Sequence, residues 1–152
     1  MQVAIVTVSS SREASADESG KALIDLLSEY GFEVAARDIV PDEIEAIADV
    51  VRGHAAQCDL VLTTGGTGIT ADDVTPEATR QVIDREVPGI AEAMRAASLE
   101  HTPMAMLSRA VAGTCGRALI VNLPGSPQAC RECFPVIAPV LRHAHEQLNR
   151  EL

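Results

Sequence analysis

Short strand-like runs alternate with segments of helical periodicity along this chain, and that alternation constrains the fold more than any other feature. The runs are too short for typical helices, and most of them end in serine, proline or glycine. They fall at residues 3–8, 33–40, 60–64 and 118–123. Between them, apolar side chains recur three and four positions apart, as in helices packed on one side. The alternation predicts an α/β fold with a largely parallel sheet covered on both faces.

Proline marks several helix boundaries. Thr75-Pro76 and Ser126-Pro127 each pair a capping hydroxyl with proline at the first helical position. Pro135 and Pro139 are expected to kink or split the last helix, because each removes a backbone donor. The segment 102–116 has no legible pattern.

Composition narrows the classes of function. The chain has 152 residues, and we expect one domain over 1–152 with an aliphatic core, since the sequence holds no Trp, one Tyr and two Phe. A formal charge of -10 argues against binding nucleic acid or an anionic membrane, which requires Lys and Arg. No apolar run reaches the roughly 18–20 residues of a membrane span. The N-terminus has no basic segment before its apolar run, so we expect a cytoplasmic protein with reduced cysteines.

A glycine-rich loop, Thr64-Gly65-Gly66-Thr67-Gly68, ends the run at 60–64. Glycine allows a close approach of the backbone to a ligand, and exposed N–H groups bind phosphate oxygens. Ligands of open α/β sheets bind at the carboxyl ends of strands, where this loop lies. The loop does not open a helix directly, as a dinucleotide fingerprint does, and it lacks the Gly-Lys-Ser/Thr of a Walker A loop. It is therefore a candidate phosphate site, although a tight turn explains its glycines equally well.

Three aspartates are candidates for work on that phosphate. Asp72 and Asp73 follow the glycine loop, and Mg²⁺ commonly binds one or two carboxylates together with substrate phosphates. Aspartates also occupy ordinary turns before helices. Asp42 follows the run at 33–40 and should lie at the same sheet edge. With Glu45 three residues later, it also fits a capping box.

A second polar loop, Pro124-Gly125-Ser126, ends the run at 118–123, and Ser9-Ser10-Ser11 ends the first. A helix N-terminus with a free hydroxyl binds anions, although Ser126 could equally be a helix cap. Three polar loops at one edge favour a cleft there. Cys130 and Cys133 share a helix without a second pair, which is a weak signal for zinc or redox chemistry.

A series of short motifs runs along nearly the whole chain. The motifs are Asp17-Glu18-Ser19-Gly20, Pro41-Asp42-Glu43, Thr64-Gly65-Gly66-Thr67-Gly68, Asp73-Val74-Thr75-Pro76-Glu77, Pro88-Gly89, Glu92-Ala93-Met94-Arg95, Leu107-Ser108-Arg109 and Asn122-Leu123-Pro124-Gly125-Ser126-Pro127. Each motif is weak alone, but the set is specific, and in this order and spacing it resembles the MogA/MoaB family of molybdopterin-binding proteins.

The resemblance implies a three-layer α/β/α domain in a homotrimer or an assembly of trimers. It implies a molybdopterin adenylyltransferase that moves AMP from ATP to the terminal phosphate of molybdopterin, with Mg²⁺, in contact with the molybdenum-insertion protein. Asp42 and Asp73 match the acidic positions around the metal and the reacting phosphates. Gly65 to Gly68 match the phosphate loop. Ser108 and Pro124-Gly125-Ser126 match the pterin side.

The chain departs from the family pattern at two positions. Ser9-Ser10 stands where members commonly have Ser-Asp, and Asp72 stands where many have a basic residue. These departures leave a second hypothesis open, that of a non-catalytic paralogue that binds molybdopterin as a MoaB-like assembly or carrier module. Molybdenum insertion is a third possibility, but the related proteins that perform it carry further domains.

Overall fold

A computed structural model describes residues 1–10 and 17–151, and within them six strands form one sheet. The strands are β1 (Gln2–Val8), β2 (Glu33–Val40), β3 (Leu60–Thr64), β4 (Arg85–Glu86), β5 (Ala112–Cys115) and β6 (Ala118–Leu123), in the spatial order β2-β1-β3-β6-β5-β4. The first four strands of this order are parallel, whereas β5 and β4 are antiparallel additions. The predicted parallel sheet is confirmed, with an antiparallel edge that the sequence did not reveal.

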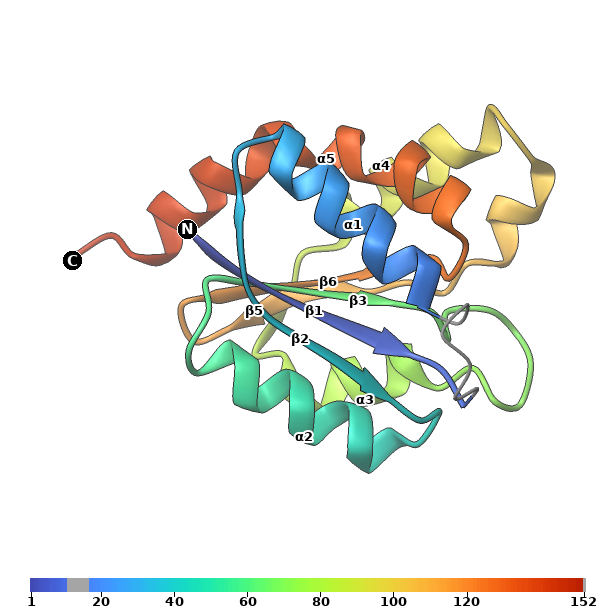
Figure 1. The fold of residues 1–152 in the computed structure, drawn as a ribbon, viewed down its shortest axis with the longest axis horizontal. Helices are drawn as coiled ribbons and strands as arrows, with labels where there is room; N and C mark the ends of the chain where they lie inside the picture. The colour runs from blue at the N-terminus through green and yellow to red at the C-terminus, as the bar shows by residue number, and fades with distance from the viewer. Residues whose placement is uncertain (11–16, 152) are drawn as a thin grey trace.

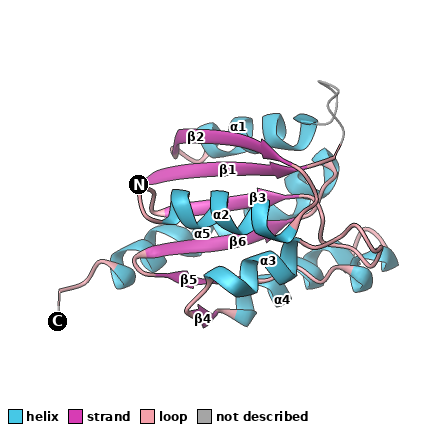
Figure 2. Ribbon diagram, turned by 90° about the horizontal axis from the view of Figure 1, so that it is seen from below, coloured by secondary structure: helices cyan, strands magenta, loops and turns pink. Residues whose placement is uncertain are grey.

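Helices cover both faces of the sheet, as Figures 1 and 2 show. The helices are α1 (Glu18–Glu29), α2 (Ile44–Ala55), α3 (Thr75–Val82), α4 (Pro88–Leu99) and α5 (Pro127–Leu148), with a 3-10 helix η2 (Pro103–Leu107). Alternate residues of β1 face opposite sides. Val3 and Ile5 pack in the core beneath α1, α4 and α5, and Ala4 and Val6 in the core beneath α2 and α3. The three-layer α/β/α architecture is therefore confirmed.

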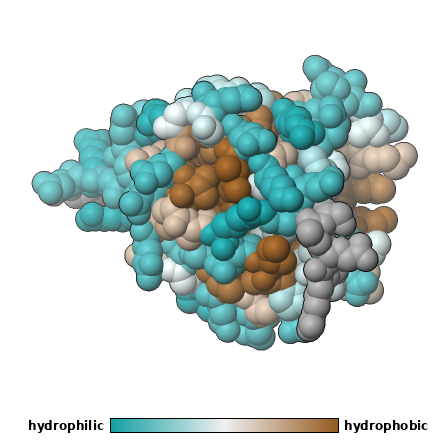
Figure 3. All heavy atoms as spheres, viewed as in Figure 1, coloured by the Kyte–Doolittle hydropathy of each residue, from teal (hydrophilic) through white to brown (hydrophobic). Residues whose placement is uncertain are grey.

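The two cores are largely aliphatic, as the composition predicts, although Phe32 and Phe134 lie in the core beneath α1, α4 and α5, and the outer faces of the helices are largely polar. Figure 3 shows that apolar surface on the face seen there is divided into separate patches by polar side chains. None of the helices among the described residues is long and apolar enough to cross a membrane.

Two predictions about helices are corrected by the structure. The last helix is not split, because α5 runs unbroken from Pro127 to Leu148 with Pro135 and Pro139 inside it. Pro139 is exposed and Pro135 partly so, which lets water reach the carbonyl groups that these prolines leave unpaired. Thr75 is not a cap, because Val74 precedes the helix and the Thr75 hydroxyl donates to the Gly65 carbonyl at 2.8 Å.

The parallel strands all end at one edge, and this edge gathers the loops that the sequence singled out. Ser9 and Ser10 follow β1, Asp42 follows β2, the glycine loop follows β3, and Pro124 follows β6. Ser11, which belongs to the first of these loops, lies outside the described residues. In Figure 1 this edge lies on the right, opposite the chain termini.

Candidate functional site

Backbone conformation and close packing require glycine at the first two glycine positions of the glycine loop. Gly65 and Gly66 have φ angles of +99° and +67°, a region that side chains rarely adopt. A Cβ atom on Gly65 would lie 2.6 Å from the Val8 carbonyl oxygen, and one on Gly66 would overlap the Thr75 hydroxyl. The turn alone thus accounts for these two glycines, and a phosphate role must rest on another feature of the loop.

That feature is a row of unpaired backbone donors. The N–H groups of Gly66, Thr67 and Gly68 have no hydrogen-bond partner within the described part of the chain, whereas the Gly65 N–H donates to the Leu123 carbonyl at 3.2 Å. Successive free N–H groups in a turn form a concave site for an anion. The loop therefore has the donors that a phosphate needs.

The second polar loop packs directly on the first. Thr64 Oγ1 donates to the Pro124 carbonyl at 2.7 Å, and a Cβ atom on Gly125 would lie 3.2 Å from the Gly65 Cα. The Ser126 hydroxyl accepts from the Ala129 N–H at 3.1 Å and so caps α5. The two loops form one surface, in which the Ser126 hydroxyl already has a structural partner.

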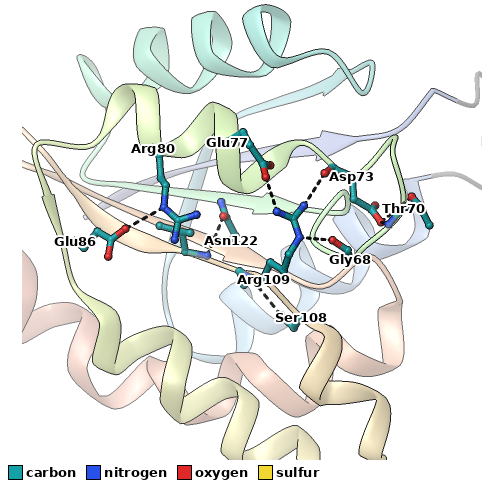
Figure 4. Close-up of polar contacts among 11 residues, drawn as sticks. Gly68, Thr70, Asp73, Glu77, Arg80, Glu86, Ser108, Arg109 and Asn122 are labelled. Atoms are coloured by element: carbon teal, nitrogen blue, oxygen red, sulfur yellow. Dashed lines mark hydrogen bonds and ion pairs between the residues drawn. The ribbon is translucent and has the colours of Figure 1, made fainter.

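Arg109, which the sequence analysis named only as part of a motif, holds the segment that follows the glycine loop. Its Nε donates to the Gly68 carbonyl and its Nη2 to the Asp73 carbonyl, each at 2.7 Å, and its Nη1 pairs with Glu77 (Figure 4). Its backbone N–H donates to the Thr67 carbonyl at 2.8 Å. The hydrogen bond from Arg109 lowers the pKa of Glu77, and burial opposes this shift. The guanidinium thus holds both ends of the turn from residue 68 to 73.

Asn122 is a second residue that the sequence analysis named only as part of a motif. It is fully buried on β6, where Nδ2 donates to the hydroxyls of Thr63 and Thr79, each at 2.9 Å. Its Oδ1 accepts from the Val111 N–H at 3.1 Å. A lone amide in an apolar strand was the available signal. Its contacts join β3, α3 and the start of β5 beneath the loops.

Asp73 lies at the end of the turn that Arg109 holds. Its Oδ2 accepts from the N–H of Thr70 at 3.0 Å and from the Thr70 hydroxyl at 2.8 Å (Figure 4). Gly68 is pressed against the same carboxylate, because a Cβ atom there would lie 2.7 Å from Oδ2. The carboxylate is thereby held in one orientation, with Oδ1 left for a ligand. The neighbouring Asp72 is exposed.

Asp42 has a different partner from the one a capping box would give it. Its Oδ2 accepts from the Ser10 hydroxyl at 2.7 Å, and its own N–H donates to Ser10 Oγ at 3.3 Å. Glu43 is the residue before α2, and no side chain caps this helix. The capping interpretation of Asp42 is therefore wrong, since the pairing of β1 with β2 brings Ser10 to Asp42 instead.

A third carboxylate lies at the end of β1. Asp17 is 5% exposed, accepts from the Thr7 hydroxyl at 2.6 Å and pairs with Arg37 of β2. A Cβ atom on Gly20 would overlap it, which explains the glycine of this motif. Asp17 is fully engaged by the fold, in contrast to Asp42 and Asp73.

The donors at this edge suit an ion shared with a substrate better than a cage made by the protein. Among the described residues, no group of three or more His, Cys, Asp or Glu side chains could hold a metal. Asp42 follows β2 closely, whereas Asp73 lies beyond the glycine loop that follows β3, and the ends of β2 and β3 lie about 10 Å apart on the two sides of β1. Mg²⁺ typically takes one or two carboxylates and completes its shell with water and phosphate oxygens. The residues present fit that mode.

A cleft of about 270 Å³ opens beside the glycine loop. Thr67, Gly68 and Pro124 line it from the strand ends, and Ser108 lines it after η2. Most of the rest of its wall comes from α4, η2 and α5, with Thr102 and Ala110 on either side of η2. The structure therefore brings Ser108 to the same cavity as the two loops, although Ser108 and the loops belong to separate motifs in the sequence.

The two cysteines of α5 are free and buried. Cys130 Sγ donates to the Pro124 carbonyl at 3.2 Å, and burial raises the pKa of its thiol to about 11. Cys133 lies 3.2 Å from the Ser98 hydroxyl, and burial likewise raises its pKa. A high pKa suppresses the reactive thiolate, so these contacts favour a packing role over redox chemistry.

Comparisons with known proteins agree on one family. The family model described as "Probable molybdopterin binding domain" matches residues 4–143. The chain is 42% identical to the molybdopterin adenylyltransferase of Helicobacter pylori over 134 residues, which cover 82% of this chain and 73% of the relative. It is 43% identical to molybdenum cofactor biosynthesis protein B of Bacillus cereus, over 97% of this chain and 90% of that protein. The crystal structure of MoaB from Thermus thermophilus superposes with a TM-score of 0.87 at 48% identity, covering 97% and 95% of the two chains.

Proposed function

The chain belongs to the molybdopterin-binding domain family, and from that premise we propose that it is a molybdopterin adenylyltransferase of molybdenum cofactor biosynthesis. It transfers AMP from ATP to the terminal phosphate of molybdopterin and releases pyrophosphate. The observation that carries the proposal is the row of free N–H groups at Gly66, Thr67 and Gly68, which lies beside the cleft. A phosphate of either substrate fits this row.

The proposed chemistry matches what the residues at the sheet edge do. Phosphoryl-type transfer depends mainly on positioning and on neutralising charge. The glycine loop positions a phosphate through backbone donors, and Arg109 keeps the following turn in place. Asp42 and Asp73 would hold Mg²⁺ brought with ATP, and the ion would neutralise charge on the reacting phosphates. A protein with a formal charge of -10 needs such a cation to bring two anions together.

We extend the proposal to the setting of the reaction. The chain acts in the cytoplasm as a homo-oligomer built from trimers, and passes its product to the molybdenum-insertion protein. Ser108 and the Pro124-Gly125-Ser126 turn lie on the pterin side. Only Ser108 and Pro124 of these line the cleft. Gly125 and Ser126 are exposed at the start of α5, so they would act at its mouth.

The test is release of pyrophosphate from ATP and Mg²⁺, with and without molybdopterin, by this chain and by Asp73→Asn. We expect release that requires molybdopterin and that the variant loses. Equilibrium binding of molybdopterin is measured in parallel on both proteins. Tight binding without release would favour the non-catalytic paralogue, and would direct attention to the departures at Ser10 and Asp72. Pyrophosphate release by Asp73→Asn at the rate of the parent chain would show that Asp73 has no catalytic role.

A further inference from the structure

The cleft beside the glycine loop is largely apolar, but one carboxylate lines it. Ala91 and Met94 of α4 and Leu107 of η2 supply apolar wall, and Glu132 comes from α5. The Glu132 side chain is 14% exposed, so its charge is largely removed from water. An ionised carboxylate in such a place is costly unless it has donors to bind. Among the described residues one side chain, Gln128, donates a hydrogen bond to this carboxylate, which leaves part of its capacity to accept open.

Contacts with neighbouring side chains fix the Glu132 carboxylate through one oxygen. Gln128, one turn earlier on α5, donates from Nε2 to Oε1 at 3.1 Å. His101, which follows α4, approaches the same Oε1 with Nδ1 at 3.8 Å. Within the described part of the chain neither contact reaches Oε2, so this oxygen is available to accept from a ligand. The carboxylate is thus oriented before any ligand binds, and an oriented acceptor discriminates between ligands.

We propose that Glu132 is the residue that recognises the heterocycle of the substrate, by accepting hydrogen bonds from the amino group and adjacent ring N–H of a pterin. The inference rests on the proposed function, which supplies the pterin. A carboxylate only accepts, so it matches an edge that carries two neighbouring donors. The edge of adenine offers an amino group beside a ring nitrogen that accepts, and a carboxylate there meets a lone pair. Glu132 therefore favours the pterin over the base of ATP in this cleft.

The size and charge of the cleft agree with this assignment. Its volume of about 270 Å³ lies just below the usual range of about 300–1,000 Å³ for ligand pockets, which suits one bicyclic ring. A carboxylate repels phosphate, so the phosphate belongs at Thr67 and Gly68, where the free N–H groups are. The other charged residue of the lining, Arg95, donates from Nη1 to the Ala110 carbonyl at 3.0 Å. The heterocycle and the phosphate thus have separate binding groups in one cleft.

The experiment compares two ring systems that differ at one position. Pterin carries an amino group at carbon 2, and lumazine carries a carbonyl oxygen there. Binding of each free compound is measured by fluorescence titration on the full chain, on Glu132→Gln and on Glu146→Gln. Glu146 lies on the same helix with its side chain 72% exposed, and it serves as the matched control. Thermal denaturation of all three proteins checks that the variants fold.

We expect the full chain and Glu146→Gln to bind pterin more tightly than lumazine. In Glu132→Gln, pterin should lose on the order of 10- to 100-fold in affinity, the range for hydrogen bonds to a charged group. Lumazine should gain, because the new amide can donate to its carbonyl oxygen. ATP affinity should stay within twofold. An unchanged ratio of pterin to lumazine in Glu132→Gln would overturn the inference, as would a full chain that binds neither ring.

Pyrophosphate release separates this inference from the proposed function. Release that requires molybdopterin, combined with an unchanged preference in Glu132→Gln, sinks the role of Glu132 alone. Selective pterin binding that depends on Glu132, without release, supports the role of Glu132 and contradicts the transferase.

Discussion

Asp73 and Asp42 are two carboxylates at one sheet edge, and the chain holds them in opposite ways. Asp73 accepts two hydrogen bonds from Thr70, and its carbonyl is held by Arg109. Asp42 is bound by the hydroxyl of Ser10, an exposed residue of a neighbouring loop. One carboxylate is fixed in advance by a network, and the other depends on a single contact.

The difference teaches where each residue can contribute. A group fixed before the reaction stabilises a charged transition state without the cost of reorganisation. A group held by one exposed hydroxyl can move with its ligand and contributes less to orientation. Asp73 is therefore expected to dominate catalysis, with Asp42 as an adjustable second ligand. Four predictions test this comparison.

The largest effect is expected from Gly65→Ala, which disturbs the glycine loop where it leaves β3, before the turn that carries Asp73. Alanine at a φ of +99° is strained, and its Cβ would lie 2.6 Å from the Val8 carbonyl oxygen. Together these costs amount to about 3 kcal/mol of unfolding free energy. Urea denaturation measures it. Gly116→Ala is the control, because Gly116 has a φ of +57° with open space around it, and it should cost about 1 kcal/mol. Equal costs would show that strain alone, and not the contact with β1, fixes the loop.

The next prediction compares the Asp73 and Asp42 carboxylates directly. Asp73→Asn should lower the turnover rate about 100-fold, the usual loss for one fixed electrostatic group. Asp42→Asn should lower it about tenfold. Asparagine keeps an oxygen that accepts from Thr70 or Ser10, so both variants should unfold within about 0.5 kcal/mol of the parent. Pyrophosphate release and thermal denaturation measure the two quantities. A larger loss at Asp42 would reverse the comparison.

A smaller effect is expected from Arg109→Lys, which removes hydrogen bonds that hold the turn from residue 68 to 73 but keeps the positive charge at position 109. One ammonium cannot replace a guanidinium that reaches Gly68, Asp73 and Glu77 at once. We expect a loss of about 2 kcal/mol in unfolding free energy, with a higher KM for ATP. Arg80→Lys is the matched control, because Arg80 makes one exposed pair with Glu86 (Figure 4) and should change stability by less than about 0.5 kcal/mol. Similar losses in both variants would mean that Arg109 does not clamp the turn.

These tests also mark what the sequence could and could not predict. The four parallel strands followed from runs of residues that form strands, and β2, β3 and β6 have the predicted bounds. The edge strands were missed because β4 has two exposed residues and β5 consists of Ala112-Gly113-Thr114-Cys115, which lacks large apolar side chains. A local pattern predicts an element only when its own residues carry the signal.

The candidate site likewise contains residues that the sequence could predict and a residue whose role it could not. The glycine loop, Asp42, Asp73 and Ser108 stood in motifs, and their placement at one edge follows from a parallel sheet. Arg109 also stood in a motif, but its clamping role was missed because two of its guanidinium partners are the carbonyls of Gly68 and Asp73, which lie 41 and 36 residues away along the chain. A carbonyl group carries no sequence signal, so a residue that acts on backbone is invisible until the fold is known.

The smallest effect concerns the pairing of Arg109 with the Glu77 carboxylate and the pH dependence of stability that this pair produces. Arg109 lowers the pKa of Glu77 below its ordinary value of 4.5, so the folded chain gains stability from this pair above that pH. The gain is lost as pH falls below 4.5 and through the lowered pKa of the folded state. Since the Glu77 side chain is 43% exposed, solvent limits the gain to about 0.5 kcal/mol. Glu77→Gln should therefore lose less stability than the parent on acidification from pH 6 to pH 3, as urea denaturation at each pH would measure. Glu86→Gln, which breaks the exposed pair with Arg80, is the matched control for removing one carboxylate and should change stability by less than about 0.5 kcal/mol. A variant at Glu77 that loses as much stability in acid as the parent would show that Arg109 fixes the turn through the carbonyls of Gly68 and Asp73 alone.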